Sequence, residues 1–203
     1  MWYQRKRLYA ALLIVLLLVL YLDREWLGRL MYPMMFAPTI VTETTRYDVD
    51  PYLATSIIRV ESNFRADKLS PKGAVGLMQL MPPTAEWIIE QSGGDPSHLG
   101  RLNEPEVNIR YGVWYLRALR EQFVEAGDDK ETEIALIAAA YNAGPGNVDK
   151  WLKEGTWSGR FEDTAQIPFG ETRHYVHRVY YYYHKYEQAY PELRAAERND
   201  SSE

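Results

Sequence analysis

Glu61 is the residue whose surroundings best suit acid–base chemistry. It ends an apolar segment, directly after Val60 and shortly before Phe64. Surroundings of low polarity disfavour the ionised form of a carboxyl group, so its pKa rises and it can hold a proton near neutral pH. Such a proton is what the protonation of a glycosidic oxygen requires. From its position alone, the favoured interpretation of Glu61 is a solvent-facing residue or a C-terminal partner to Arg59 or Arg65.

Three further segments combine polar side chains with residues that break regular backbone, as loops that present chemistry often do. They are residues 76–82 (GLMQLMP), 140–146 (AYNAGPG) and 167–176 (IPFGETRHYV). In the first, Gln79 lies among apolar residues and needs hydrogen-bond partners, which backbone or an amide-bearing ligand could supply. In the second, the glycines let the backbone approach another group closely. Taken singly, each segment could be no more than a helix terminus.

The elements that must position these segments are helices, because apolar residues follow helical spacing from Tyr47 onward. Asp50 and Pro51 form a helix start, with a capping Asp before a proline at the first helical position. The helix that they begin is expected to end near Glu61. Further helices are expected at about residues 83–89, 104–119, 131–141, 148–152 and 171–190. Short extended pieces are possible near 69–78 and 155–168, so the expected fold class is a compact, mainly α domain.

The first 22 residues read as a membrane anchor. Arg5, Lys6 and Arg7 precede an uncharged apolar run over residues 8–22. A spanning helix has about 20 apolar residues, so the run is short, but Trp and Tyr residues on both sides suit the membrane interfaces. No small-residue cleavage site follows, which favours a retained transmembrane helix over a cleaved signal peptide. The basic cluster predicts that residues 1–7 are cytoplasmic and that the remaining chain is extracytoplasmic, as in a single-pass protein of the cell membrane.

The remaining chain divides into a connector over residues 23–46, a catalytic domain over 47–190 and a polar, disordered tail over 191–203. The sequence contains no cysteine, so no disulfide and no lipid-modified cysteine is expected. All 28 acidic residues lie from position 23 onward, against 20 of the 23 basic residues. Because this part of the chain is acidic, nucleic acid is not an expected partner.

Together, these segments in this order resemble the soluble lytic transglycosylase (SLT) family of peptidoglycan-cleaving enzymes, which is related in fold to goose-type lysozymes. The resemblance covers roughly residues 47–186. The matching motifs are Glu61-Ser62 with Phe64, residues 76–82, Asn108-Ile109 with Tyr111-Gly112 and Tyr115-Leu116, residues 140–146, and Glu171-Thr172-Arg173 with Tyr175-Val176. Two positions depart from the family pattern, His174 and Pro83, and they bear on substrate fit more than on the acid. The resemblance implies a lysozyme-like helical domain behind the transmembrane helix.

The resemblance also implies a mechanism with one carboxylate. Most glycosidases use two, and Glu171 is the only candidate partner for Glu61 in the four segments. In the family's reaction, Glu61 would protonate the β-1,4 oxygen between N-acetylmuramic acid and N-acetylglucosamine, while the muramic acid's 2-acetamido group stabilises the developing charge. Glu61 would then act as a base on the 6-hydroxyl of the same sugar. The product is a 1,6-anhydromuramoyl end, and the reaction needs neither metal nor cofactor.

Residues around the acid would bind the substrate, as the resemblance implies. Met78 and Gln79 would bind the sugar beside the scissile bond, and Ser62 would help to orient it. Tyr141 and Asn142 would line the subsite and position the acetamido group. For Tyr141, simple packing in the core is the alternative.

On the far side of the site, Glu171 and Tyr175 would shape the wall. The expected function is therefore a membrane-anchored lytic transglycosylase whose partner is the glycan strand of peptidoglycan. A lysozyme-type hydrolase would share the fold and Glu61 but would add water to the bond. An inactive wall-binding or scaffold protein is the alternative from another functional class.

Overall fold

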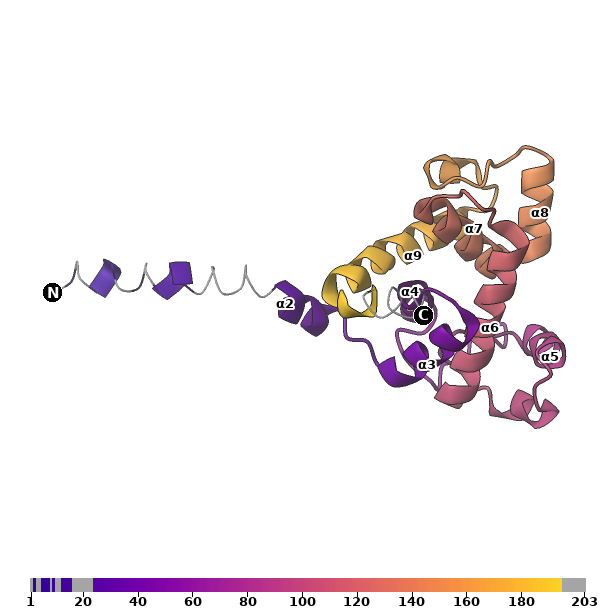
Figure 1. The fold of residues 1–203 in the computed structure, drawn as a ribbon, viewed down its shortest axis with the longest axis horizontal. Coiled ribbons are helices and arrows are strands. Elements are labelled where there is room, and N and C mark those ends of the chain that lie inside the picture. The colour runs from indigo at the N-terminus through magenta and orange to yellow at the C-terminus, as the bar shows by residue number, and fades with distance from the viewer. Residues whose placement is uncertain (1, 3–4, 8, 10–11, 16–23, 195–203) are drawn as a thin grey trace. The chain divides into compact units, whose positions relative to one another are not determined.

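The computed structural model describes residues 2, 5–7, 9, 12–15 and 24–194 (Figure 1). Most of the predicted anchor at 8–22 and of the predicted tail at 191–203 lies outside these residues. Within the described part of the chain, none of the helices combines the length and the apolar content needed to cross a membrane. The chain divides into two compact units, Met35–His184 and the N-terminal residues up to Met34 together with the residues from Lys185 onward.

The unit Met35–His184 is built from helices, as the sequence predicts. In chain order they are α3 (Ala37–Tyr47), α4 (Pro51–Glu61), α5 (Pro82–Gln91), the 3-10 helix η1 (Pro96–Arg101), α6 (Pro105–Phe123), α7 (Lys130–Ala143), α8 (Pro145–Lys153), the 3-10 helix η2 (Phe161–Gln166) and most of α9 (Gly170–Ala189) (Figure 1). The described residues form no β-strand, but Val75 makes isolated bridges to Leu69 and Leu80. The mainly α fold class is therefore confirmed, and the extended piece expected near 69–78 consists of these bridges.

The helix α4 is the buried element that carries Glu61. Asp50 caps its N-terminus by accepting a hydrogen bond from the Tyr52 N–H at 2.9 Å, and Pro51 occupies the first turn. Every residue from Pro51 to Ile58 is buried. The Tyr183 hydroxyl on α9 donates to the capping Asp50 carboxylate at 2.6 Å. A helix fixed at its start and enclosed along its length holds its last residue, Glu61, in a defined place.

The segment before α4 belongs to this unit rather than to a connector. In this segment α3 begins at Ala37, with Pro38 in its first turn. It packs against α4 and α6 and buries Ile40, Glu43 and Thr44. The compact unit therefore starts at Met35, earlier than the boundary expected at residue 47.

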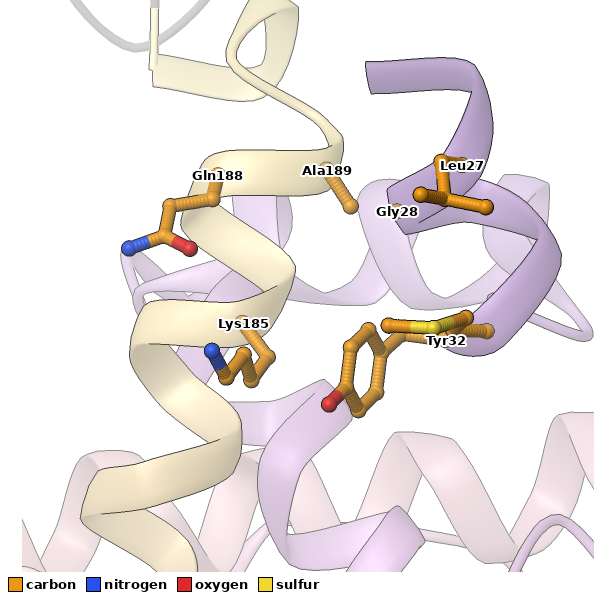
Figure 2. A pocket seen from close by; sticks show the side chains of 7 residues that line it. Leu27, Gly28, Tyr32, Lys185, Gln188 and Ala189 are labelled. Atoms are coloured by element: carbon orange, nitrogen blue, oxygen red, sulfur yellow. The ribbon is translucent and has the colours of Figure 1, made fainter. Parts of the chain in front are cut away.

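The second unit joins α2 (Arg24–Met31) to the end of α9 and the residues after it (Figure 2). A Cβ atom added to Gly28 would lie 3.0 Å from the Cβ of Ala189, so glycine permits this close approach. Arg29 donates to the Ala189 carbonyl at 2.9 Å and pairs with Glu192 at 2.9 Å. The Met34 N–H donates to the Tyr190 hydroxyl at 2.9 Å. Residues 24–34 are thus tied to the C-terminal end of α9.

Candidate active site

The carboxyl group of Glu61 stands at the C-terminal end of α4 and is half-buried. The Tyr175 hydroxyl donates a hydrogen bond to its Oε1 at 2.7 Å. Burial raises the pKa of Glu61 to about 7, against the lowering effects of the Tyr175 hydrogen bond and of the Lys68 and Arg178 charges. The negative charge of Glu171 adds to the rise. A carboxyl group with this pKa can both give and take a proton near neutral pH.

The chain turns sharply directly after Glu61. Ser62 caps the C-terminus of α4, with its N–H donating to the Ile58 carbonyl at 3.0 Å and its hydroxyl donating to the same oxygen at 3.2 Å. The next two residues, Asn63 and Phe64, have φ of 55° and 61°, in the left-handed region that non-glycine residues seldom adopt. Ser62 is only 1% exposed. Its side chain therefore acts on the helix end, and an orienting role can reach a ligand only through Glu61.

The loop that carries residues 76–80 is fastened to α6 by Asn108. This fully buried side chain accepts from the Met78 N–H at 2.7 Å and donates to the carbonyls of Val75 at 2.9 Å and Leu102 at 2.7 Å. A Cβ atom added to Gly76 would lie 2.3 Å from the Asn108 amide nitrogen, and Gly76 has φ of 80°. Glycine at this position is therefore required for the loop to reach Asn108.

Met78 lies in the core beneath this loop. It is 0% exposed, and a Cβ atom added to Gly112 would lie 2.1 Å from its sulfur atom. A direct contact between the Met78 side chain and a sugar, as expected from the resemblance, does not fit this placement. The physical reason is that Gly112 on α6 has no side chain, and Met78 fills the space that a side chain would occupy there.

Gln79, by contrast, is half-buried and reaches the surface of the loop. Its φ is 50°, and its amide nitrogen donates to the carbonyls of Lys68 at 3.0 Å and Gly76 at 2.8 Å. These two bonds orient the amide so that its oxygen is the atom left to meet a ligand. An amide oxygen accepts hydrogen bonds from N–H and O–H groups, both of which an N-acetylated sugar offers.

The end of α7 contributes Tyr141 and Asn142. The Tyr141 hydroxyl donates to the Met78 carbonyl at 2.7 Å, which ties α7 to the loop. Burial, followed by the negative charge of Glu61, raises the pKa of Tyr141, so its hydroxyl stays protonated. Asn142 is half-buried and its amide oxygen accepts from the Thr172 hydroxyl at 2.7 Å, so its amide nitrogen is the group that can donate to a ligand. Tyr141 thus has a structural role, and it lies close enough to Glu61 for the charge of that carboxyl group to raise its pKa.

The first turns of α9 complete the site. Tyr175 is buried, and burial together with the nearby Glu61 charge raises its pKa, so it remains a hydrogen-bond donor. Glu171 is exposed but close enough to influence the pKa of Glu61. His174 is exposed on the same helix. In the described part of the chain, no group of three or more His, Cys, Asp or Glu residues is placed to hold a metal ion.

Two cations near the acid were not anticipated from the sequence. The Lys68 ammonium group donates to the backbone carbonyl of Glu61, and Arg178 acts on the Glu61 carboxyl through its charge. Arg178 follows Tyr175 by three positions on α9, and this spacing places both on one face of a helix. Lys68 lies in a loop, and no periodic signal in the sequence connects it with Glu61.

Residues 38–163 match the family model of the Transglycosylase SLT domain. The chain belongs to this family. The chain is 39% identical over 155 residues to the soluble lytic murein transglycosylase of Salmonella typhimurium, a match that covers 74% of this chain and 23% of that protein. It is 33% identical over 118 residues to the membrane-bound lytic murein transglycosylase C of Haemophilus ducreyi, covering 57% of this chain and 32% of the relative.

Solved structures of such enzymes share the fold. An inactive mutant of the lytic transglycosylase Slt from Pseudomonas aeruginosa aligns with a TM-score of 0.69 at 37% identity, over 79% of this chain and 25% of the other. The 70 kDa soluble lytic transglycosylase of Escherichia coli aligns with a TM-score of 0.66 at 32% identity, over the same shares of the two chains. The predicted SLT-type, lysozyme-like fold is thereby confirmed. The chain spans about a quarter of the length of the curated soluble relatives, 23% in the first case.

Proposed function

We propose that this SLT domain cleaves the glycan strands of peptidoglycan as a lytic transglycosylase, with Glu61 as its single acid and base. The observation that carries the proposal is the half-buried Glu61 carboxyl, whose pKa lies at about 7 and whose Oε1 is held by Tyr175 at 2.7 Å. The names of the relatives, lytic murein transglycosylases, support the same substrate class.

In the first step, protonated Glu61 gives its proton to the β-1,4 oxygen between N-acetylmuramic acid and N-acetylglucosamine. The bond from this oxygen to the anomeric carbon of the muramic acid then breaks, and the departing N-acetylglucosamine keeps the proton as a hydroxyl group. The carbonyl oxygen of the muramic acid's own 2-acetamido group stabilises the positive charge on the anomeric carbon. Because the Tyr175 hydroxyl donates to Oε1, the proton is carried on the other oxygen, Oε2.

In the second step, Glu61 is a carboxylate, and it removes the proton from the 6-hydroxyl of the same muramic acid. The 6-oxygen then bonds to the anomeric carbon, which gives the 1,6-anhydro ring and regenerates protonated Glu61. No water is consumed, so atoms balance between substrate and products. The positive charges of Lys68 and Arg178 stabilise the carboxylate that exists between the two steps.

Nearby side chains bind the sugar that carries the acetamido group. The Gln79 oxygen is placed to accept from its N–H, and the Asn142 amide nitrogen is placed to donate to its oxygens. Tyr175 and Glu171 form the wall on the α9 side. Ser62 and Met78 act indirectly, since both are buried and support the residues that reach the ligand.

Muropeptide mass spectrometry tests the reaction and the acid together. Purified peptidoglycan is treated with the full chain, with Glu61→Gln and with a matched control, Glu106→Gln, which changes an exposed Glu on α6. We expect anhydromuropeptides from the wild type and the control and none from Glu61→Gln. Reducing ends, one water heavier, would instead identify a lysozyme-type hydrolase. Binding to peptidoglycan without release of fragments would identify a wall-binding protein.

We also propose that residues 8–22 anchor the chain in the cell membrane, with the SLT domain outside the cytoplasm. The support is the basic cluster at residues 5–7, the apolar run that follows it and the absence of a cleavage-site pattern. Alkaline carbonate extraction of membranes, followed by intact mass analysis, tests this. An anchored chain stays in the membrane pellet at its full mass of 23.6 kDa. A cleaved signal peptide would leave a lighter chain in the supernatant.

A further inference from the structure

A row of aromatic rings leads from the acid to the surface at α5. The Tyr141 ring lies 5.5 Å from that of Tyr115 on α6, and Tyr115 lies 6.3 Å from Trp87 on α5. Trp87 also lies 5.9 Å from Trp114. The inner end of the row is at the site, because the Tyr141 pKa responds to the charge of Glu61. The outer end is at Trp87, two ring-to-ring steps away.

The outer end of the row is open to solvent. Trp87 is 46% exposed, and Met81, which lies between Gln79 and Trp87 in the sequence, is 38% exposed. Trp87 is held by edge-on contacts with Trp114 and Tyr115 at interplanar angles of 68° and 79°. Contacts on two sides already order the Trp87 ring, so little conformational entropy of this side chain is lost when a ligand stacks on it.

The chemistry of this surface suits an uncharged, partly apolar ligand. The helix α5 carries no basic residue, and its charged residues Glu86 and Glu90 are exposed. An anionic ligand would therefore meet only like charge along α5. A pyranose ring presents a face of C–H groups, and an N-acetyl group adds a methyl, so an N-acetylated sugar matches an exposed indole.

We propose that Trp87, supported by Trp114 and Tyr115, is a distal subsite that stacks on a sugar of the glycan strand beyond the two sugars flanking the scissile bond. This inference rests on the proposed function. It makes Trp87 a residue that selects long strands over short ones. The simpler role, in which Trp87 only packs α5 on α6, predicts an effect on folding that does not depend on ligand length.

Binding measured without turnover tests the subsite. The full chain in detergent carries Glu61→Gln, and isothermal titration uses uncharged β-1,4-linked N-acetylglucosamine oligosaccharides of two and six sugars, because a peptide-free muramic acid would add a free lactyl carboxylate. We expect the hexasaccharide to bind more tightly than the disaccharide. Trp87→Ala should weaken hexasaccharide binding about tenfold, the usual size of one lost aromatic contact, with a much smaller change for the disaccharide. Trp87→Phe should restore most of the loss.

A matched control is Tyr181→Ala, which removes an aromatic side chain that is 50% exposed on α9 and should leave both affinities unchanged. Equal losses for both oligosaccharides in Trp87→Ala, or no loss for either, would overturn the subsite. So would a parent chain that binds both lengths equally. These binding measurements do not depend on cleavage. A failure to find anhydro products would therefore count against the proposed reaction and not against the subsite at Trp87.

The helix α2 carries a second inference, from an apolar face that is independent of the site. Trp26, Leu27, Leu30 and Met31 are 56%, 39%, 65% and 54% exposed. Their spacing places them on one side of a helix. Gly28 is directed toward α9, where Figure 2 shows it beside Ala189. The exposed face is thus a consequence of how α2 meets α9.

We infer that this face lies in the interface of a lipid bilayer. The apolar run of residues 8–22 ends two positions before α2 begins at Arg24, so an anchored chain brings α2 to the membrane surface. Trp and long aliphatic side chains suit the boundary between headgroups and acyl chains. The charge of Arg29 is engaged by Glu25 and Glu192, which keeps it away from the apolar face. This inference rests on the proposed anchor and not on the proposed reaction.

Site-directed spin labelling tests it, because the chain has no native cysteine. Single cysteines replace Leu30, Met31 or, as a control, the exposed Gln188 on α9, and the full chain is reconstituted in phospholipid vesicles. We expect nitroxides at 30 and 31 to collide more with oxygen and less with a water-soluble nickel chelate than the nitroxide at 188. Equal nickel access at all three positions would overturn the inference. Strong spin–spin coupling between labels at position 30, together with nickel access as high as in water, would instead show that this face contacts a second copy of the chain.

Discussion

The proton affinity of Glu61 is the balance of opposing influences on one carboxyl group. Burial disfavours its charge, while the Tyr175 hydroxyl, Lys68 and Arg178 favour it. The result is a pKa of about 7 in place of 4.5, which matches the dual role of acid and base. The hydrogen bond and each of the two positive charges can be removed by a single substitution, so their effects on the pKa of Glu61 can be measured.

Activity should therefore depend on pH around the Glu61 pKa. The reaction starts from protonated Glu61, so kcat/KM should decline as pH rises through about 7. On the acid side, activity should also decline, because a persistently protonated Glu61 is a poor base for the second step. Initial rates of anhydromuropeptide release between pH 4.5 and 9 measure the profile. A flat profile over several pH units would contradict a raised pKa.

The free energy of unfolding should also depend on pH through the protonation of Glu61. Because the pKa of Glu61 is raised on folding, from 4.5 to about 7, the folded state binds the proton more tightly. The stability from this group is thus fully present below pH 4.5 and is lost as pH rises through 7. Glu61→Gln should raise the unfolding free energy at pH 8 by up to about 3 kcal/mol. The gain should be much smaller at pH 4.5. Urea denaturation at the two pH values gives the difference, and an equal effect at both would rule out the shifted pKa.

Tyr175→Phe should shift the alkaline limb of the pH–rate profile to higher pH. The substitution removes a hydrogen bond that lowers the pKa of Glu61, so the carboxyl group should hold its proton to higher pH, by about one unit. Its kcat should fall, since Oε1 is no longer oriented. The matched control is Tyr180→Phe, also on α9, which removes a hydrogen bond of the same length, 2.7 Å, to Glu131 on α7. A Tyr175→Phe profile that coincides with the wild type would show that this bond does not tune the acid.

At the scale of elements, the site depends on how the loop of residues 76–80 is attached to α6. The buried Asn108 makes three hydrogen bonds to backbone groups from Val75, Met78 and Leu102. Without it, the Met78 N–H and the Leu102 carbonyl would lose their partner, while the Val75 carbonyl would keep its bond from the Leu80 N–H at 3.0 Å. The loop carries Gln79, so its attachment links packing in α6 to the geometry of the ligand site.

Asn108→Ala should therefore be strongly destabilising. Leaving buried backbone groups without partners costs about 1–3 kcal/mol each, so we expect a loss of about 3 kcal/mol in the free energy of unfolding. Chemical denaturation measures the loss, with Asn103→Ala as control, because Asn103 is exposed beside the same helix. If Asn108→Ala unfolds at the same denaturant concentration as the control, the loop does not depend on Asn108.

Sequence periodicity predicted most of these elements, and it failed where tertiary contacts decide. Asp50 and Pro51 signalled the start of α4 because capping chemistry is local. Most of α3, by contrast, was assigned to the connector predicted over residues 23–46. Glu43 is among the buried residues of α3. A charged residue usually indicates a solvent-facing position, and only the structure shows that Arg46 and Arg110 pair with Glu43.

At the scale of the whole molecule, the described chain is two units that share α9. The unit Met35–His184 holds every residue of the candidate site. The other unit consists of α2 with the end of α9, joined at Gly28 and Ala189. The two can therefore be perturbed separately, and the SLT domain should keep its chemistry when the α2 contact is lost.

Gly28→Leu should release α2 without disabling the site. A Cβ atom at position 28 would already lie 3.0 Å from the Ala189 Cβ, and a larger side chain cannot fit between the helices. Limited trypsin digestion should then cut at Arg29 several-fold faster, while anhydromuropeptide release stays within about twofold of the wild type. The control is Gly100→Leu, where nothing lies within 4 Å of an added Cβ. Loss of activity in Gly28→Leu alone would show that the units are coupled.

The sequence by itself determined the family and the order of the motifs and singled out Glu61 as the proposed acid, because motifs and helix caps depend on residues close together in the chain. Only the tertiary structure decided which motif residues face a ligand. Met78 and Ser62 are buried, while Tyr175 reaches Glu61 across 114 positions of sequence. That the charges of Lys68 and Arg178 lower the pKa of Glu61 could not be predicted from the sequence either. The physical reason is that burial and charge proximity arise from packing between distant segments, and a carboxyl group acquires its pKa only once those segments surround it.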